Sequence, residues 1–186
     1  MLSCLDLTIG YDQPLKKNIS FELKYGEITF LQGKNGSGKS TLIKTLLGDI
    51  KSLSGQVLWC IDKSDASYLA QQTAIESHFS YTVGEVLEIY NVPEKFKKLI
   101  SPKVMTKNWH KTSGGEKQKA MILTKIKKST KLLILDEPFN HLDIESTKLI
   151  NQLLAHLLNS KTILSVLLVS HIKVNIKGVK VNEVLL

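Results

Sequence analysis

The amino-acid sequence predicts an α/β fold with a mixed β-sheet core, an N-terminal antiparallel β part and a small helical subdomain. Apolar and polar residues alternate over residues 2–9 and 19–23, a pattern typical of antiparallel strands joined by a turn near residues 10–14. Downstream, short apolar runs alternate with helical patterns, which favours a parallel sheet covered by helices. Because 186 residues suffice for one packed domain, we expect residues 1–186 to form a single domain with a helical insertion over about residues 72–128.

Local signals indicate the remaining elements in order along the chain. Residues 28–31 form a short apolar strand that enters a glycine-rich loop, and a helix over residues 40–47 ends at Gly48, a residue type favoured just after a helix. Two helices are expected to start after Thr82 and Ser113, because each is followed three residues later by a glutamate, the spacing of a capping box. The other expected elements are helices over residues 93–100, 113–128 and 143–158, and strands over residues 56–61, 67–70, 131–135, 162–169 and 178–186, the last at a sheet edge.

A glycine-rich segment between a predicted strand and a predicted helix carries the strongest functional signal. Residues 33–40 match G-x-x-x-x-G-K-[ST], a pattern whose backbone N–H groups and helix N-terminus bind phosphate oxygens. Lys39 would contact the β- and γ-phosphates of a nucleotide, and Ser40 would offer its hydroxyl to Mg²⁺. The alternative is a glycine-rich turn with an incidental lysine, which the strand-to-helix context disfavours. We expect the nucleotide to be bound by Gly33, Lys34, Asn35, Gly36, Ser37, Gly38, Lys39, Ser40 and Thr41.

Two adjacent acids follow the apolar run over residues 131–135. Ligands of open α/β sheets bind at the carboxyl ends of the strands, so Asp136 could hold Mg²⁺ there. Glu137 could act as the general base that polarises the attacking water. An Asp-Glu pair on its own could equally be a solvated strand end. Together with the phosphate loop, the pair predicts an NTPase site.

The chain resembles, over nearly its whole length, the ATP-binding subunits of ABC transporters. Besides the two motifs above, residues 112–116 (Thr-Ser-Gly-Gly-Glu) resemble the family's signature motif, L-S-G-G-Q, which separates this class from other P-loop NTPases. The sequence departs from that motif at Thr112 and Glu116, which replace leucine and glutamine. The resemblance implies a second anion-binding surface at a helix N-terminus, which caps the γ-phosphate of ATP held by a partner subunit. That surface would consist of Ser113, Gly114, Gly115 and Glu116.

Four further positions take implied roles from the resemblance. Gln71 matches the family's Q-loop glutamine, which contacts Mg²⁺ and water, and the neighbouring Gln72 is the alternative assignment. Asp143 matches the D-loop residue at the dimer interface, and His171 matches the switch histidine that reaches the γ-phosphate. Tyr11 is placed like the aromatic residue that stacks on adenine. The implied catalytic set is Lys39, Gln71, Glu137 and His171, and the implied metal set is Ser40, Gln71 and Asp136.

Composition bears on the setting of the protein. The net charge is +8, and all 25 basic residues are lysine. Since bidentate base recognition usually relies on arginine, we expect no nucleic-acid partner, whereas the charge suits an anionic membrane surface. The longest apolar run, residues 163–169, is far shorter than a membrane span, and residues 1–6 show no signal-peptide pattern. We therefore expect a cytoplasmic protein that is peripheral on the cytoplasmic face of the cell membrane.

The resemblance implies an ATP-binding and ATP-hydrolysing subunit, with ATP and Mg²⁺ as its ligands. It also implies two partners, a second ATP-binding subunit (the same chain or a close homologue) and a transmembrane permease. The alternatives are a soluble ABC-type ATPase that acts in translation or DNA maintenance, and a module that binds ATP without hydrolysing it. Residues 79–87 are similar to the segment after the Q-loop in importers of metals and metal chelates, with Tyr81 in place of a proline. The other interpretation of that segment is a capped helix start that only docks.

Overall fold

A computed structural model describes residues 1–71, 80–170 and 176–186. Within these ranges the strands form two separate sheets. The first has three antiparallel strands in the order β2 (Pro14–Leu23), β1 (Leu2–Gly10) and β4 (Ser54–Trp59). This sheet is the N-terminal antiparallel part that the alternating sequence pattern predicts, and its first turn lies between Gly10 and Pro14.

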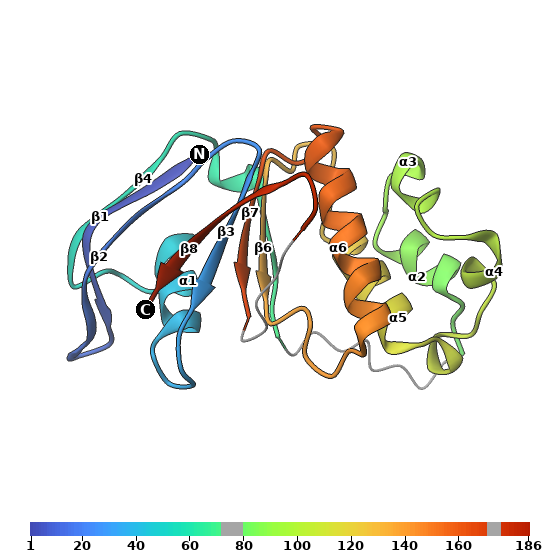
Figure 1. The fold of residues 1–186 in the computed structure, drawn as a ribbon, viewed down its shortest axis with the longest axis horizontal. Coiled ribbons are helices and arrows are strands. Elements are labelled where there is room, and N and C mark those ends of the chain that lie inside the picture. The colour runs from blue at the N-terminus through green and yellow to red at the C-terminus, as the bar shows by residue number, and fades with distance from the viewer. Residues whose placement is uncertain (72–79, 171–175) are drawn as a thin grey trace.

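The second sheet carries the central part of the fold. Its five strands lie in the order β5, β6, β7, β3 and β8, and each neighbouring pair is parallel. Parallel strands point their carboxyl ends to one edge, which is the lower edge of the sheet in Figure 1. The strands are β3 (Glu27–Gln32), β5 (Ala66–Leu69), β6 (Leu132–Asp136), β7 (Ser165–Val169) and β8 (Lys180–Leu185), with β8 at an edge as predicted.

Helices cover both faces of the parallel sheet (Figure 1). Helix α1 (Lys39–Leu47) lies between the two sheets, and α6 (Ile144–Asn159) lies on the opposite face of the parallel sheet. Beyond α6 lies α5 (Gly114–Thr124), and beyond α5 lie the short helices of the predicted helical insertion. The short helices are α2 (Val83–Ile89), α3 (Glu94–Lys97) and α4 (Pro102–Met105). Two 3₁₀ helices in the described ranges are η1 (Lys63–Asp65) and η2 (Trp109–Lys111).

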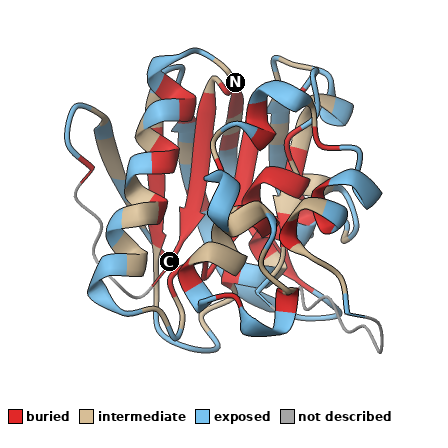
Figure 2. Ribbon diagram, turned by 90° about the vertical axis from the view of Figure 1, so that its right-hand side faces the viewer, coloured by how far each residue is buried: buried red, intermediate tan, exposed pale blue. Residues whose placement is uncertain are grey.

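The buried apolar residues form two cores, one on each face of the parallel sheet. Strand β6 contributes to both, because side chains alternate along a strand. Leu133 and Leu135 belong to the core under α5 and α6, whereas Leu132 and Ile134 belong to the core shared with α1 and the antiparallel sheet. Figure 2 shows the buried strands behind helices that are exposed on their outer faces.

Local sequence signals account for most helix ends. Both predicted capping boxes are present, because Thr82 and Ser113 exchange hydrogen bonds with the glutamates three residues later. Helix α5 ends at Thr124 instead of continuing to Lys128, since the Thr130 hydroxyl accepts the backbone N–H of Lys127 and bends the chain towards β6. Helix α4 had no expected counterpart in the sequence. In the described ranges no helix has the length and apolar character needed to cross a membrane.

Candidate nucleotide site

The glycine-rich loop joins β3 to α1 at the carboxyl edge of the parallel sheet. Gly38, the residue before α1, has a φ of 98°, a conformation that residues with a Cβ rarely adopt. The loop is also tight at Gly33, because a Cβ there would lie 2.4 Å from the hydroxyl oxygen of Ser37, which would have to move. The loop therefore folds tightly enough to direct its backbone at a ligand in front of the helix N-terminus.

Lys39 is buried at the start of α1 and points back across the loop. Its Nζ donates hydrogen bonds to the carbonyl oxygens of Gly33 and Lys34, at 2.7 and 3.1 Å. These contacts hold the ammonium group at the centre of the loop, where a phosphate would be enclosed by the loop backbone. A lysine in this position acts as a point charge on the terminal phosphates of a nucleotide.

Asp136 ends β6 and faces the first turn of α1. Its Oδ2 accepts hydrogen bonds from the hydroxyl groups of Ser40, at 3.4 Å, and of Tyr68, at 3.2 Å. Burial raises the pKa of Asp136 above its ordinary value, against the opposing effect of these two hydrogen bonds and of the charge on Lys39. Burial and the nearby Asp136 carboxylate also raise the pKa of Tyr68, so the phenol remains a donor at neutral pH.

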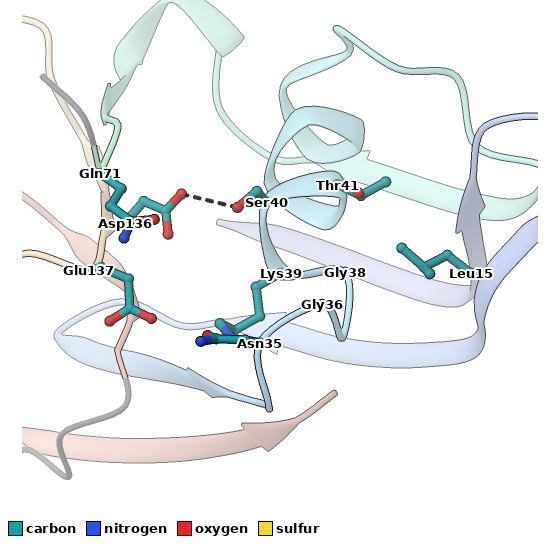
Figure 3. Close-up of a pocket in the computed structure, with 10 residues that line it drawn as sticks. All are labelled: Leu15, Asn35, Gly36, Gly38, Lys39, Ser40, Thr41, Gln71, Asp136 and Glu137. Atoms are coloured by element: carbon teal, nitrogen blue, oxygen red, sulfur yellow. Dashed lines mark hydrogen bonds between the residues drawn. The ribbon is translucent and has the colours of Figure 1, made fainter.

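Glu137 follows Asp136 in a left-handed backbone conformation, with a φ of 52°. Its N–H donates to the carbonyl oxygen of Val169, at 2.8 Å, so the chain stays attached to β7 while it turns. Such strained conformations of non-glycine residues are often found at functional sites. The carboxylate of Glu137 is buried beside Asp136 and faces the same cavity, as Figure 3 shows.

A cavity of about 470 Å³ lies between the loop and the ends of β5 and β6. Figure 3 shows Lys39 and Ser40 on one side of it, with Asp136 and Glu137 on the opposite side. Of the phosphate-loop residues predicted to bind nucleotide, Gly33, Lys34 and Ser37 are not among the side chains that line it. The lining residues are Leu15, Asn35, Gly36, Gly38, Lys39, Ser40, Thr41, Gln71, Asp136 and Glu137.

Leu15 is the lining residue that the sequence motifs do not indicate. It lies near the start of β2, and its Cδ2 is 3.0 Å from where a Cβ on Gly38 would be. Tyr11, the predicted adenine-stacking residue, is 64% exposed in the turn before β2 and does not line the cavity. The sequence signal for Leu15 is a single leucine, half-exposed in the structure, that precedes three polar residues at the start of a strand. This signal can be recognised only once the turn over residues 10–14 is assigned.

The predicted signature residues form a second surface outside this cavity. Ser113 caps α5, and its hydroxyl accepts the N–H of Glu116 at 3.3 Å. A Cβ on Gly115 would lie 2.4 Å from the Ser146 hydroxyl oxygen, so α5 packs closely against the start of α6. Asp143 caps α6 through the Ser146 N–H, at 2.7 Å. The signature surface and the predicted D-loop residue Asp143 therefore adjoin each other.

Two residues singled out in the sequence, His171 and Gln72, lie outside the described residues.

The oxygen groups at the cavity fit a magnesium ion. Mg²⁺ is usually held by one or two carboxylates together with substrate phosphates and water. The Asp136 carboxylate and the Ser40 hydroxyl share a hydrogen bond at the cavity, and the exposed Gln71 adds an amide oxygen nearby. The described part of the chain has no cluster of three or more His, Cys, Asp or Glu side chains that could hold a metal alone. The site therefore suits an ion that arrives with a nucleotide.

Comparison with known proteins identifies the family. The family described as ABC transporter matches residues 16–140, a span that includes the phosphate loop, the signature surface and the two acids. The chain belongs to the ABC transporter family. It therefore carries an ATP-binding ATPase domain of the ABC type, and the predicted α/β fold class is confirmed.

Individual relatives differ in how much of their length this chain spans. The Zinc import ATP-binding protein ZnuC of Rickettsia prowazekii is 33% identical, over 87% of this chain and 71% of its own length. The Ribosome protection protein VmlR of Bacillus subtilis is 34% identical over 86% of this chain, but only 26% of its own length. The chain spans between 25% and 32% of four of the curated relatives that it matches.

A solved structure shows the same fold. The ATP-binding protein of an ABC transporter from Pyrococcus furiosus superposes with a TM-score of 0.79, covering 100% of this chain and 96% of that chain. At 20% sequence identity, this likeness concerns the fold alone.

Proposed function

We propose that the chain is the ATP-binding and ATP-hydrolysing subunit of an ABC transporter and works as one half of a pair of such subunits. The observation that carries this proposal is the convergence of Lys39, Ser40, Asp136 and Glu137 on one cavity. These side chains come from the start of α1 and from the end of β6 with the residue that follows it, yet they supply a cation, a hydroxyl and two carboxylates around a space of about 470 Å³. That set provides phosphate binding, metal binding and a general base together.

Each group has a definite role in this proposal. Lys39 binds the β- and γ-phosphates, while Ser40, Gln71 and Asp136 hold Mg²⁺. The ion neutralises charge on the phosphates when it is bound. Glu137 takes a proton from water as the water oxygen attacks the γ-phosphorus, and the bond from phosphorus to the leaving ADP oxygen breaks. His171, two residues after β7 in the sequence, would contact the γ-phosphate.

The remaining proposed residues need a second subunit. Ser113, Gly114, Gly115 and Glu116 lie at the N-terminus of α5 outside the subunit's own cavity, so a nucleotide held by a facing copy is their natural ligand. Asp143, exposed at the start of α6 beside them, would lie in the same interface. We propose a dimer that encloses two ATP molecules, each between the phosphate loop of one copy and the signature surface of the other. Tyr11 and Leu15 would contact the adenine side of the nucleotide.

The transport role is supported by the likeness to ZnuC, whose name describes an import ATP-binding protein and most of whose length the chain spans. We propose that residues 1–186 act as one ABC ATPase domain, and that α2 to α4 transmit its motion to a separate transmembrane permease. In that arrangement the chain sits on the cytoplasmic face of the membrane, where its charge of +8 is favourable next to anionic lipids.

A second candidate function is action on the ribosome. It is favoured by the 34% identity to VmlR, which is named as a ribosome protection protein. Affinity purification of the chain with ATP present separates the two. A multi-span membrane protein in the purified complex supports the transport role, and ribosomal subunits in its place support the second candidate.

The hydrolytic site is tested with Glu137→Gln. Phosphate release should fall by about 10²-fold or more, because the general base is lost, whereas ATP binding and ATP-dependent dimerisation persist. The matched control is Glu145→Gln, an exposed acid that pairs with Lys148 on the first turn of α6. Hydrolysis by the Glu137→Gln protein at the wild-type rate would remove Glu137 from the base role. A chain that stays monomeric with ATP would contradict the dimer.

A further inference from the structure

We propose that Lys107 is a positioning residue for the signature surface, because it neutralises Glu116 and so allows that surface to accept the triphosphate of ATP held by a second copy. This inference rests on the proposed dimer. It also accounts for a departure of this chain from the family motif, which has an uncharged glutamine where this chain has Glu116.

Lys107 and Glu116 form an ion pair in which the lysine contacts both carboxylate oxygens. The Nζ of Lys107 lies 2.7 Å from Oε1 of Glu116 and 2.9 Å from Oε2. The side chain of Glu116 is 20% exposed and that of Lys107 is 34% exposed, so water only partly screens the contact. Charge-assisted hydrogen bonds of this length are among the stronger polar contacts in proteins.

The Glu116 carboxylate is held in one orientation from two sides. Its Oε2 also accepts the backbone N–H of Ser113, at 3.1 Å, as part of the capping box. Burial acts to raise the pKa of Glu116, but the hydrogen bonds from Lys107 and Ser113 outweigh it, and the pKa lies below its ordinary value. Glu116 is therefore a charged carboxylate at neutral pH, three residues from the serine that begins the signature surface.

Backbone hydrogen bonds hold the chain around Lys107 against the residues that precede and begin α2. The carbonyl oxygen of Lys107 accepts the N–H of Val83, at 3.0 Å, and Asn108 forms an antiparallel bridge with Thr82. The N–H of the buried Trp109 donates to the carbonyl oxygen of Tyr81, at 2.7 Å. These contacts fix the chain so that the lysine side chain reaches α5, which lies after it in sequence.

Electrostatics explains why the pair matters for the surface. A helix N-terminus attracts anions through its unpaired N–H groups and its dipole. An uncompensated carboxylate in the first turn would oppose that attraction and repel the negative charges of a triphosphate. Lys107 cancels this charge. A glutamine at the same position would need no cation, so the effect of removing Lys107 should depend on the presence of Glu116.

A double-mutant cycle measures this dependence. All variants carry Glu137→Gln, so that hydrolysis does not disperse the dimer, and dimerisation is followed by light scattering as ATP is titrated. Lys107→Met should raise the ATP concentration for half-maximal dimerisation about tenfold, as expected when a charge-assisted contact is lost. With Glu116→Gln also present, Lys107→Met should change it by less than about twofold. The control is Lys103→Met, an exposed lysine of α4 with no ion pair to any described residue.

Other results would separate the possible failures. Lys107→Met should leave binding of a fluorescent ATP analogue to the monomer unchanged, because Lys107 does not line the cavity of its own subunit. An effect of Lys107→Met that is equally large with and without Glu116→Gln would indicate a merely structural role and overturn the inference. The inference is also overturned if Lys107→Met changes the ATP concentration for half-maximal dimerisation no more than Lys103→Met does. Neither of these two results contradicts the proposed dimer. Failure of the parent Glu137→Gln protein to dimerise with ATP would overturn the dimer and the inference together.

Discussion

The hydroxyl of Tyr68 donates a hydrogen bond to Oδ2 of Asp136 across 3.2 Å. The two residues lie near the carboxyl ends of neighbouring parallel strands, since Tyr68 is the residue before the last of β5 and Asp136 is the last of β6. The same carboxylate oxygen accepts the hydroxyl of Ser40 from α1. The acid that we propose as a metal ligand is thus oriented by donors from a strand and a helix before any nucleotide arrives.

Tyr68→Phe should impair hydrolysis without preventing ATP binding. The substitution keeps the ring but removes a hydrogen bond that lowers the pKa of Asp136. The acid limb of the pH profile for kcat should therefore move to higher pH, and kcat at neutral pH should fall about three- to tenfold, as for one lost hydrogen bond to a charged group. The control is Tyr25→Phe, an exposed tyrosine in the turn before β3. An unchanged pH profile for Tyr68→Phe would refute the orienting role.

Asp136→Asn should stabilise the fold while abolishing Mg²⁺-dependent hydrolysis. Burial raises the pKa of Asp136 above 3.8, its ordinary value, because the buried site favours the protonated acid. Asp136 therefore contributes most to the stability of the fold below pH 3.8, and this contribution is lost as the pH rises through the pKa of Asp136 in the folded protein. At pH 7 the buried charge is therefore unfavourable, and the amide should raise the melting temperature by about 2–4 °C, or about 1 kcal/mol. The gain should shrink as the pH falls to about 4. A lower melting temperature at pH 7 would contradict this reasoning.

The two glycines of the signature surface should differ in their tolerance of a methyl group. A Cβ on Gly115 would lie 2.5 Å from the Cβ and 2.9 Å from the Cα of Ser146, whereas one on Gly114 would make ordinary contact with Leu142, at 3.4 Å. Gly115→Ala should therefore reduce the free energy of unfolding by about 1–3 kcal/mol, the usual effect of overpacking. Gly114→Ala should reduce it by less than about 1 kcal/mol. Urea unfolding of the nucleotide-free protein measures both, and equal losses would argue against the close approach of α5 and α6.

Leu15→Ala should weaken nucleotide binding. Leu15 lines the cavity beside Gly38 and Thr41, where it can cover part of the base or ribose. Losing about 1 kcal/mol of apolar contact should raise the KM for ATP about fivefold with little change in kcat. Leu58→Ala, at a half-exposed leucine of β4, serves as the control. Equal KM values for the two variants would show that Leu15 does not contact the nucleotide.

Local patterns predict the fold well where the sequence signal is local. The phosphate loop, the two capping boxes and the glycine that ends α1 each depend on a few adjacent residues, and the structure contains all of them. The apolar runs of β6 and β7 identify buried parallel strands for the same reason. Helix α4 is only four residues long, too short to produce a recognisable apolar period.

Contacts between distant segments are the part that the sequence does not reveal. Leu15 reaches the phosphate loop because the chain turns back after β1 and places the start of β2 next to Gly38. Tyr68 reaches Asp136 because β5 pairs with β6. The pairing of Lys107 with Glu116 depends in the same way on the bridge between Thr82 and Asn108. Leu15, Tyr68 and Lys107 belong to none of the motifs recognised in the sequence, and each is identified by its contacts in the folded chain.

The shared strand β6 also bears on how the protein unfolds. Because its alternating leucines and isoleucine anchor the cores on both faces of the sheet, neither core can come apart while β6 stays ordered. Separating either core from the sheet exposes apolar side chains of β6 and its neighbouring strands, so the two cores should unfold in one cooperative transition. The amide protons of β6 should accordingly exchange with solvent only through global unfolding, at rates that track the stability of the whole chain.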